Sequence, residues 1–232
     1  EHSFPTRRSP DLIAVIKNSV KYEMEDKKIL IPIIFIPTLG IILQILFKDL
    51  ILIWSSTSIS LLIYYIFLLE LQFKYDVQTR IKNRAAFEKE MEQYVKRNKN
   101  ATIFMFDLNN LKSTNDKHGH KAGDEMIFLA AKIIEESFMG IGKAYRIGGD
   151  EFCVICNEIP RELLDSAISN LDDLLIKENQ KRHIKIVLAY GYAIYNKDEN
   201  ESIYSTFVQV DKNMYTHKAK LKEFYGTLEN DQ

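Results

Sequence analysis

The heptapeptide RIGGDEF, residues 146–152, is the stretch of sequence that decides the fold. Gly148 and Gly149 suit the positive φ angles of a tight hairpin turn, and they let the backbone approach a phosphate closely. Asp150 and Glu151 follow directly, and adjacent carboxylates can bind Mg²⁺. The apolar residues 152–156 are typical of a strand. The stretch therefore predicts a metal-bearing β-hairpin, although Gly-Gly-Asp alone is also common in ordinary surface turns.

A second acidic position follows the run ATIFMF, residues 101–106, which is apolar at nearly every position. Such a run is typical of a strand buried on both faces, and it ends at Asp107. If this strand neighbours the hairpin, Asp107 lies beside Asp150, and carboxylates from two strands make a site for hard cations. Two such ions can hold nucleotide phosphates and activate a hydroxyl for in-line attack. Taken alone, an acid at such a position is more often simply the polar end of a strand.

The periodicity from residue 70 onward alternates between helix and strand. We expect helices over 83–98, 120–138, 160–178 and 203–220, and strands over 101–107, 143–147, 151–156 and 184–193. This order predicts an α+β fold with a ferredoxin-like antiparallel sheet covered by helices. Cys153 and Cys156 are three residues apart on one expected strand, so they should face opposite sides as buried thiols, not as a zinc or redox pair.

Two apolar runs, residues 29–47 and 50–69, precede this domain, with Lys48 and Asp49 between them. Each run would rise about 27 to 30 Å as a helix, which matches the hydrocarbon thickness of a bilayer. We therefore expect a transmembrane hairpin, the alternative being buried helices of a soluble protein. Basic residues flank the pair on both sides and predict that both ends are cytoplasmic; they are Lys17, Lys21, Lys27, Lys28, Lys74, Arg80, Lys82 and Arg84.

The remaining segments complete the expected organisation. Residues 1–12 resemble a translated sequencing adapter, with a genuine basic leader as the alternative, and residues 13–28 should be a cytoplasmic juxtamembrane segment. A connecting helix over 70–82 should join the bilayer to a catalytic domain over 83–225, followed by a tail over 226–232. The net charge of −1 argues against nucleic acid as a partner.

Several further motifs lie around the hairpin at fixed spacing. The run DLNNLKSTNDKHGHKAGD spans residues 107–124, DVQTRIKNR spans 76–84, AYGYA spans 189–193, and DKNMYTHK spans 211–218. Together with RIGGDEF, these runs resemble the GGDEF family of diguanylate cyclases over residues 76 to 225. The resemblance implies a nucleotidyl-cyclase-type fold in a bacterial protein, and with the apolar runs it implies a multi-pass inner-membrane enzyme whose catalytic domain is cytoplasmic.

The resemblance also implies an activity and a set of roles. Members condense two GTP molecules into cyclic di-GMP and two pyrophosphates, each subunit of a homodimer presenting one GTP to the other. By position, Asp107, Asp150 and the Leu108 carbonyl would bind two Mg²⁺ or Mn²⁺ ions, and Glu151 would support catalysis. The substrate-binding residues would be Gly148 and Gly149 at the turn, Asn115 and Asp124 at the guanine edge, and Lys218 and Lys222 at the phosphates. Lys112 would be a catalytic residue that adds positive charge near the phosphates. Unknown cyclic di-GMP receptors would read the product.

The sequence departs from the common family pattern in the opening motif and near the hairpin. Gln78 replaces the usual Leu and Arg80 the usual Gly, and we expect these changes to act on the hinge, not on catalysis. Asn109, Leu111 and Lys222 are milder departures. The product-binding R-x-x-D of many members is absent.

Met139 and Gly142 occupy the positions of that R-x-x-D pair, so we expect no feedback inhibition through that site. Asp124 favours GTP alone as substrate, because relatives that make a mixed adenine-guanine product lack this acid. Two alternatives remain at this point: a catalytically silent GTP-binding or scaffolding module, and a purely structural membrane anchor.

Overall fold

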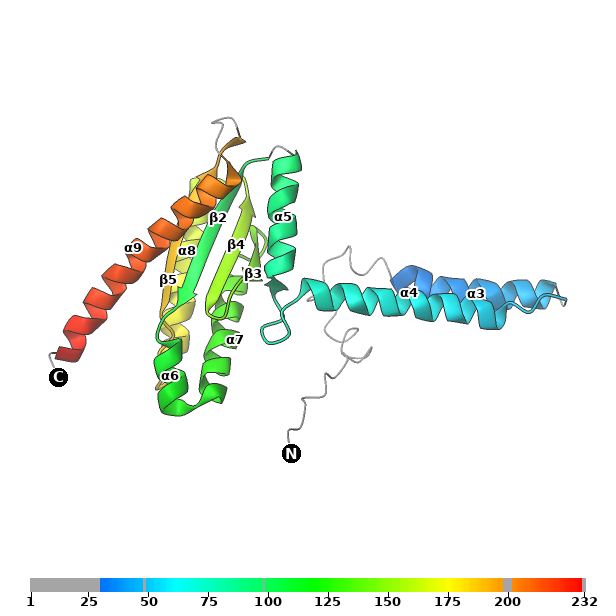
Figure 1. Cartoon of the computed structure of the whole chain (residues 1–232), viewed down its shortest axis with the longest axis horizontal. Coiled ribbons are helices and arrows are strands. Elements are labelled where there is room, and N and C mark those ends of the chain that lie inside the picture. The colour runs from blue at the N-terminus through cyan, green and yellow to red at the C-terminus, as the bar shows by residue number, and fades with distance from the viewer. Residues whose placement is uncertain (1–29, 48, 98, 198–201, 231–232) are drawn as a thin grey trace. The chain divides into compact units, whose positions relative to one another are not determined.

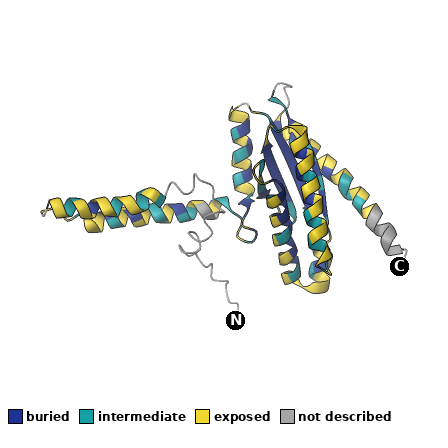
Figure 2. Ribbon diagram, turned by 180° about the vertical axis from the view of Figure 1, so that it is seen from behind, coloured by how far each residue is buried: buried dark blue, intermediate teal, exposed yellow. Residues whose placement is uncertain are grey.

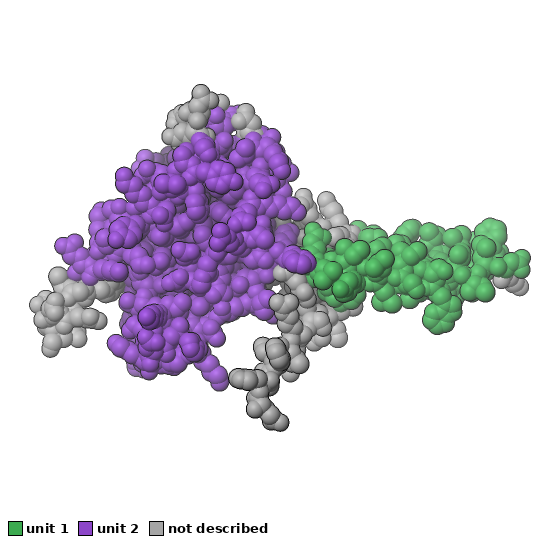
Figure 3. Space-filling model, in the orientation of Figure 1, with its two compact units in different colours: residues 1–71 green, residues 72–232 purple. Residues whose placement is uncertain are grey.

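The computed structural model describes residues 30–230 except 48, 98 and 198–201, and these residues fall into two compact units. The first unit covers residues up to Leu71 and the second begins at Gln72 (Figure 3). The expected leader over 1–12 and the juxtamembrane segment over 13–28 lie outside the described residues.

The first unit is an antiparallel pair of helices, α3 (Leu30–Leu46) and the greater part of α4 (Ile53–Lys74). The Gln44 side chain accepts hydrogen bonds from the backbone N–H groups of Leu52 (3.0 Å) and Ile53 (3.1 Å), and so caps the start of α4. Deeper in the pair, the Ser60 hydroxyl donates to the Ile33 carbonyl. Gly40 packs directly on α4, since a Cβ there would lie 2.2 Å from the Ser56 hydroxyl oxygen. Polar and small groups thus hold the two helices together.

The outer surface of these two helices is apolar. Ile34, Phe35 and Trp54 are among the large apolar side chains that are more than half exposed, and Figure 2 shows both helices mostly in the exposed colour. Residues Ile53–Glu70 are, within the described part of the chain, the one stretch long and apolar enough to cross a membrane, with a mean hydropathy of 1.4. Helix α3 is apolar as well but shorter, at 17 residues. Composition thus supports one candidate span, and the second span stays a prediction.

The second unit is built on a five-stranded sheet in the order β1-β3-β4-β2-β5. The strands are β1 (Lys82–Asn83), β2 (Ala101–Leu108), β3 (Gly142–Arg146), β4 (Glu151–Asn157) and β5 (Leu188–Tyr195). The last four pair antiparallel in the ferredoxin-like order that the sequence predicted. The short β1 pairs parallel with β3, so the sheet is mixed and the expectation of a purely antiparallel sheet was wrong.

Helices cover both faces of this sheet (Figure 1). Helices α7 (His120–Ser137) and α8 (Arg161–Gln180) pack on one face, where Phe104, Phe106 and Val154 lie. Helices α5 (Arg84–Arg97) and α9 (Ile203–Asn230) pack on the other face, where Ile103 and Met105 lie. Strand β2 is buried along its whole length, as its uninterrupted apolar run predicted.

The two cysteines confirm the expected alternation along β4. Cys153 belongs to the core on the α5/α9 face, and Cys156 belongs to the core on the α7/α8 face. Burial raises the pKa of the Cys153 thiol well above its usual value and raises the pKa of Cys156 to about 12. Both are therefore protonated core residues.

Besides β1, four further elements differ from the sequence prediction. Helix α6 (Leu111–His118) was not predicted, since its sequence lacks an apolar stripe. Strand β5 begins at Leu188 instead of 184, because the Asn179 side chain bonds both the N–H and the carbonyl of Ile186, each at 2.8 Å, and holds the preceding loop. Helix α9 runs on to Asn230. The connecting helix expected through 82 ends at Lys74.

A turn explains why that helix stops. The Asp76 carboxylate accepts hydrogen bonds from the Thr79 N–H (2.8 Å) and hydroxyl (2.7 Å), which is the local bonding that competes with helix. Arg80 then adopts a left-handed φ of 67°, where a helix cannot continue. The chain reverses here, and Tyr75 forms an isolated β-bridge with Lys82.

Candidate active site

The Gly148-Gly149 turn joins β3 to β4, as predicted, but not through positive φ angles. Among the described glycines, positive φ occurs at Gly119 and Gly140 only, so that expectation was wrong. The absent side chain matters at Gly148 for space, because a Cβ there would lie 2.5 Å from a carboxylate oxygen of Glu151. At Gly149 a Cβ would meet no atom within 4 Å. The space beside Gly149 is therefore open, and the approach of a phosphate to this backbone stays a prediction.

Arg146 braces the turn from the end of β3. Its Nε donates to the Gly148 carbonyl (3.2 Å), and its Nη2 donates to the Gly149 carbonyl (2.8 Å). Its Nη1 forms an ion pair with Asp76 at 3.0 Å. Burial raises the pKa of Asp76, but the hydrogen bonds from Thr79 and from Arg146 outweigh burial and leave the pKa below its usual value. One guanidinium thus ties the turn to the segment that follows α4.

The two acidic positions meet at the end of the central strands. Asp107 pairs in register with Glu151 across β2 and β4, and the Leu108 N–H donates to the Asp150 carbonyl at 2.9 Å. The adjacency of Asp107 and Asp150 inferred from the sequence is therefore present. Asp107 is only 7% exposed. A buried carboxylate is costly unless a cation or hydrogen bonds compensate it.

Lys218 from α9 supplies one such cation. Its Nζ lies 2.7 Å from the Asp107 carboxylate and donates a hydrogen bond to Oδ2. The same Nζ lies 2.7 Å from the other oxygen, Oδ1, so both carboxylate oxygens face the ammonium group. Within the described residues, the buried Oδ1 of Asn109 accepts no hydrogen bond. A buried amide oxygen without a donor, beside a carboxylate, is compatible with a cation that takes oxygen ligands. Asp107, Leu108 and Asp150 lie together at this end of the strands, and their role as metal ligands stays a prediction.

A cleft of about 670 Å³ opens beside these acids. It brings together five of the predicted site residues, namely Leu108, Lys112, Asp150, Lys218 and Lys222. The cleft is also lined by Asn109, Asn110, Leu111, Ser113, Asp116, Lys117, Val187 and Leu221. Of the predicted phosphate-binding lysines, all three face this space. Most of the further lining residues lie in or next to α6, and the polar composition of that segment was the sequence feature that could have indicated them.

The predicted guanine-reading residues lie on α6 and α7, outside that cleft. Asn115 has a buried Oδ1 that accepts no hydrogen bond in the described chain, and a Cβ at Gly123 would lie 2.0 Å from it. Gly123 thus makes room for the Asn115 amide. Asp124 is exposed, and its Oδ1 accepts a hydrogen bond of 2.9 Å from Gln78. Sequence reasoning missed Gln78, because the two residues are 46 positions apart.

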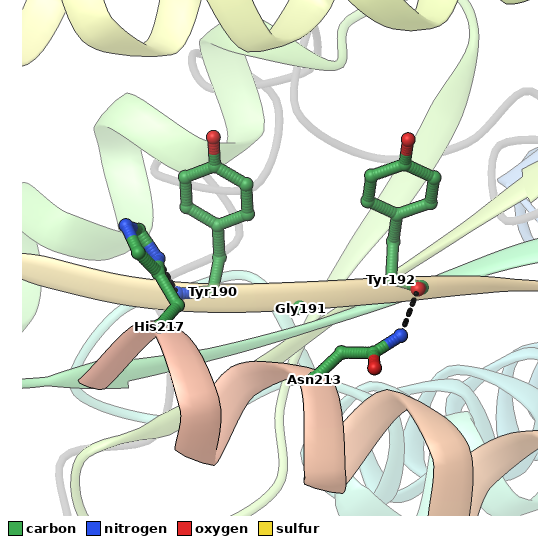
Figure 4. Close-up of a pocket in the computed structure, with 5 residues that line it drawn as sticks. All are labelled: Tyr190, Gly191, Tyr192, Asn213 and His217. Atoms are coloured by element: carbon green, nitrogen blue, oxygen red, sulfur yellow. Dashed lines mark hydrogen bonds between the residues drawn. The ribbon is translucent and has the colours of Figure 1, made fainter. Parts of the chain in front are cut away.

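A second pocket of about 490 Å³ lies along β5 (Figure 4). His217 and Asn213 of α9 reach the strand there: the Tyr190 N–H donates to His217 Nδ1, and the Asn213 amide donates to the Tyr192 carbonyl, both at 3.0 Å. Burial lowers the pKa of His217, which favours the neutral imidazole that can accept. These bonds satisfy the outer edge of β5 and hold α9, and so Lys218, in place.

The sequence profile of the family described as "Diguanylate cyclase, GGDEF domain" matches residues 73–223. This chain belongs to the GGDEF family. The matched residues contain every side chain of the site, and their limits agree closely with those of the second unit.

Curated relatives and solved structures agree with this GGDEF assignment. "Probable diguanylate cyclase DgcJ" of Escherichia coli is 29% identical over 150 residues, which are 62% of this chain and 29% of the relative. "Diguanylate cyclase VdcA" of Vibrio cholerae is 26% identical over 148 residues, 62% of this chain and 44% of the relative. The chain thus spans less than half the length of these relatives.

The fold is shared with solved GGDEF domains. The coiled coil and GGDEF domain of DgcB from Caulobacter crescentus, in complex with c-di-GMP, superposes with a TM-score of 0.63 at 21% identity. The match covers 72% of this chain and 91% of that one. At this identity the likeness establishes the GGDEF fold.

Proposed function

We propose that this chain is a diguanylate cyclase that condenses two GTP molecules into cyclic di-GMP and two pyrophosphates. The observation that carries the proposal is the meeting of Asp107 with the Asp150 segment beside a cleft lined by Lys112, Lys218 and Lys222. A carboxylate pair for cations next to three lysines for phosphates suits a triphosphate substrate. The family assignment supports the same reaction.

Two Mg²⁺ or Mn²⁺ ions would be held by Asp107, Asp150 and the Leu108 carbonyl, where they would offset phosphate charge and acidify the attacking 3′-hydroxyl. The described residues contain no group of three or more acidic, histidine or cysteine side chains that could enclose a metal. The nucleotide phosphates would therefore supply the missing oxygen ligands, as is usual for Mg²⁺. This dependence makes cation and substrate binding cooperative.

The lysines act on the triphosphate. Lys218 Nζ lies 2.7 Å from the Asp107 carboxylate, and with a cation held at Asp107 this ammonium group would be available to the phosphates. Lys222 lies one helical turn further along α9 on the same face and lines the same cleft. Lys112 faces them from α6. The Glu151 carboxylate, folded over Gly148, lies next to the metal ligands and supports catalysis.

Asn115 and Asp124 select GTP as the substrate, because their acceptor atoms match the N–H donors on the guanine edge. Each subunit holds one GTP, so the product requires two subunits, and we propose a homodimer in which the sites face each other. The apolar helices α3 and α4 anchor the chain as a two-span hairpin in a bacterial inner membrane, with the catalytic unit in the cytoplasm. Cyclic di-GMP then acts through receptors elsewhere.

The direct test uses residues 70–232 fused to a dimerising coiled coil, incubated with GTP and Mg²⁺. We expect cyclic di-GMP from the parent protein, none from Asp150→Ala, and unchanged yield from Asp165→Ala, whose carboxylate is exposed on α8. The full chain in detergent micelles is assayed in parallel, because the fusion removes α3 and most of α4. GTP binding without product from either parent form would instead support a silent GTP-binding or scaffolding module.

A further inference from the structure

Gln78 lies in the turn that follows α4 and bridges two parts of the site. Its Nε2 donates to Oδ1 of Asp124 at 2.9 Å and approaches the Asp124 carbonyl at 3.5 Å. Its Oε1 accepts from Nη1 of Arg146 at 2.6 Å. Arg146 in turn holds the Gly148 and Gly149 carbonyls. A single amide therefore connects the metal-binding turn to the carboxylate at the guanine edge.

The orientation of this amide is fixed by its two neighbours. Arginine carries donors only, so the atom that faces Arg146 must be the amide oxygen. An ionised carboxylate accepts only, so the atom that faces Asp124 must be the amide nitrogen. Both bonds involve a charged group, and such bonds are about twice as strong as neutral ones. Leucine, the residue that is usual at this motif position, can form neither bond.

We propose that Gln78 is a positioning residue for guanine recognition, which sets the Asp124 carboxylate and couples it to the turn after α4. This inference rests on the proposed function, in which Asp124 reads guanine. The carboxylate is exposed, and without a partner it samples several rotamers, which substrate binding has to restrict. The bond from Gln78 fixes Oδ1, so that Asp124 can accept from both guanine donors, the ring N1–H and the adjacent 2-amino group.

The experiment compares two nucleotides that differ at one of those donors. Inosine lacks the 2-amino group, and 3′-deoxy triphosphates lack the attacking hydroxyl, so binding of 3′-deoxy-GTP and 3′-deoxy-ITP is measured without turnover. The full chain in detergent micelles is titrated by calorimetry with Mg²⁺ present. The wild-type chain should bind the guanine nucleotide roughly tenfold or more tightly, as expected for one hydrogen bond to a charged group.

Two variants of Gln78 and one control separate the roles of the two bonds. Gln78→Leu should lower that affinity ratio about three- to tenfold, because Asp124 loses its donor. Gln78→Glu keeps the acceptor for Arg146 but places a second carboxylate against Asp124, so it should lower the ratio at least as much. The control, Val77→Ala, changes an exposed neighbour in the same turn and should leave the ratio unchanged.

The result that would overturn the proposal is an unchanged ratio in Gln78→Leu, whether or not affinity for both nucleotides falls together. A wild-type chain without preference for 3′-deoxy-GTP would overturn it as well. Cyclic di-GMP synthesis by the wild-type chain is assayed separately. Product formation with an unchanged ratio retains the proposed function and rejects the role of Gln78. A Gln78-dependent ratio without any product retains the role and rejects the cyclase activity.

Discussion

Gly191 is the position where one added methyl group should damage both the fold and the site. A Cβ there would lie 2.2 Å from the Met214 nitrogen, 2.6 Å from the Val210 oxygen and 2.7 Å from the Asn213 carbonyl carbon. All three atoms are backbone of α9, so no side chain can rotate away. Ordinary contact begins near 3.4 Å, and α9 would have to retreat from β5 by about 1.2 Å.

We expect Gly191→Ala to cost about 3 kcal/mol in the free energy of unfolding, the upper end for overpacking, since both contacting groups are rigid. For a unit of this size that corresponds to a fall of roughly 6 to 12 °C in Tm, measured by circular dichroism at 222 nm. The retreat also moves Lys218 away from Asp107, to which it is 2.7 Å distant in the wild-type chain. Misplacement of a positioning group by about 1 Å costs on the order of a hundredfold in turnover.

The matched control for stability is Gly149→Ala, where a Cβ meets no atom within 4 Å and φ is not positive. Its Tm should stay within about 2 °C of wild type, because exposed substitutions of this kind change stability by at most about 0.5 kcal/mol. If Gly191→Ala also unfolds within about 2 °C of wild type, α9 does not press on β5, and the account of how Lys218 is positioned is wrong.

Three further predictions concern regulation, thiols and acid. Titration with cyclic di-GMP should not lower the initial rate of synthesis through the R-x-x-D product-binding site, since Met139 and Gly142 replace its charged pair. Sub-micromolar noncompetitive inhibition would contradict this. Cys153 and Cys156 should resist a thiol reagent at pH 8 until guanidinium unfolds the chain, because burial raises both pKa values, that of Cys156 to about 12, and rapid labelling of the native protein would refute their burial. The lowered pKa of Asp76 contributes stability that is present above its unfolded pKa of about 3.9 and is lost as the pH falls through its folded value. Asp76→Asn should therefore have a lower free energy of unfolding than wild type at pH 7, and that free energy should fall less between pH 5 and about pH 2. Chemical denaturation at each pH measures this, and the same loss of unfolding free energy in both proteins would disprove it.

The sequence predicted the sheet and the acidic pair because both follow from local patterns. An apolar run that ends in Asp107 and a Gly-Gly turn before an apolar strand allow few pairings, and the antiparallel register brings Asp107 opposite Glu151. The lysines of α9 were placed by family motif and by helical spacing, and both Lys218 and Lys222 do line the cleft. These are short-range signals combined by one common topology.

The sequence could not predict features that depend on tertiary contact alone. Helix α6 has no apolar stripe of its own, and it packs closely on α7, where Gly123 leaves room for Asn115. The glycines of the turn were assigned to positive φ from their residue type, whereas at Gly148 the Glu151 carboxylate occupies the space that a Cβ would take. In both cases the position of a neighbouring side chain, which residue type alone does not give, decides the outcome.

The two departures in the opening motif have different physical meanings, and the structure separates them. Arg80 keeps the left-handed backbone of a position that is usually glycine, at a cost of roughly 1 kcal/mol. Its N–H still donates to the Asp76 carbonyl at 2.9 Å, so the turn is maintained by the bonds around Asp76 and not by the residue type at 80.

Gln78, in contrast, adds contacts that leucine cannot make, and both go to residues of the site. Asn83 ties the last turn of α4 to β1 through the Phe73 carbonyl at 2.9 Å, and β1 pairs with β3, which ends at Arg146. Any displacement of that last turn should therefore move Arg146 by two routes: through the pairing of β1 with β3, and through the contacts of Asp76 and Gln78 with its guanidinium group. Because Gln78 also binds Asp124, such a displacement should change guanine affinity together with the geometry of the metal-binding turn, and the two should vary in parallel across variants of residues 73–83.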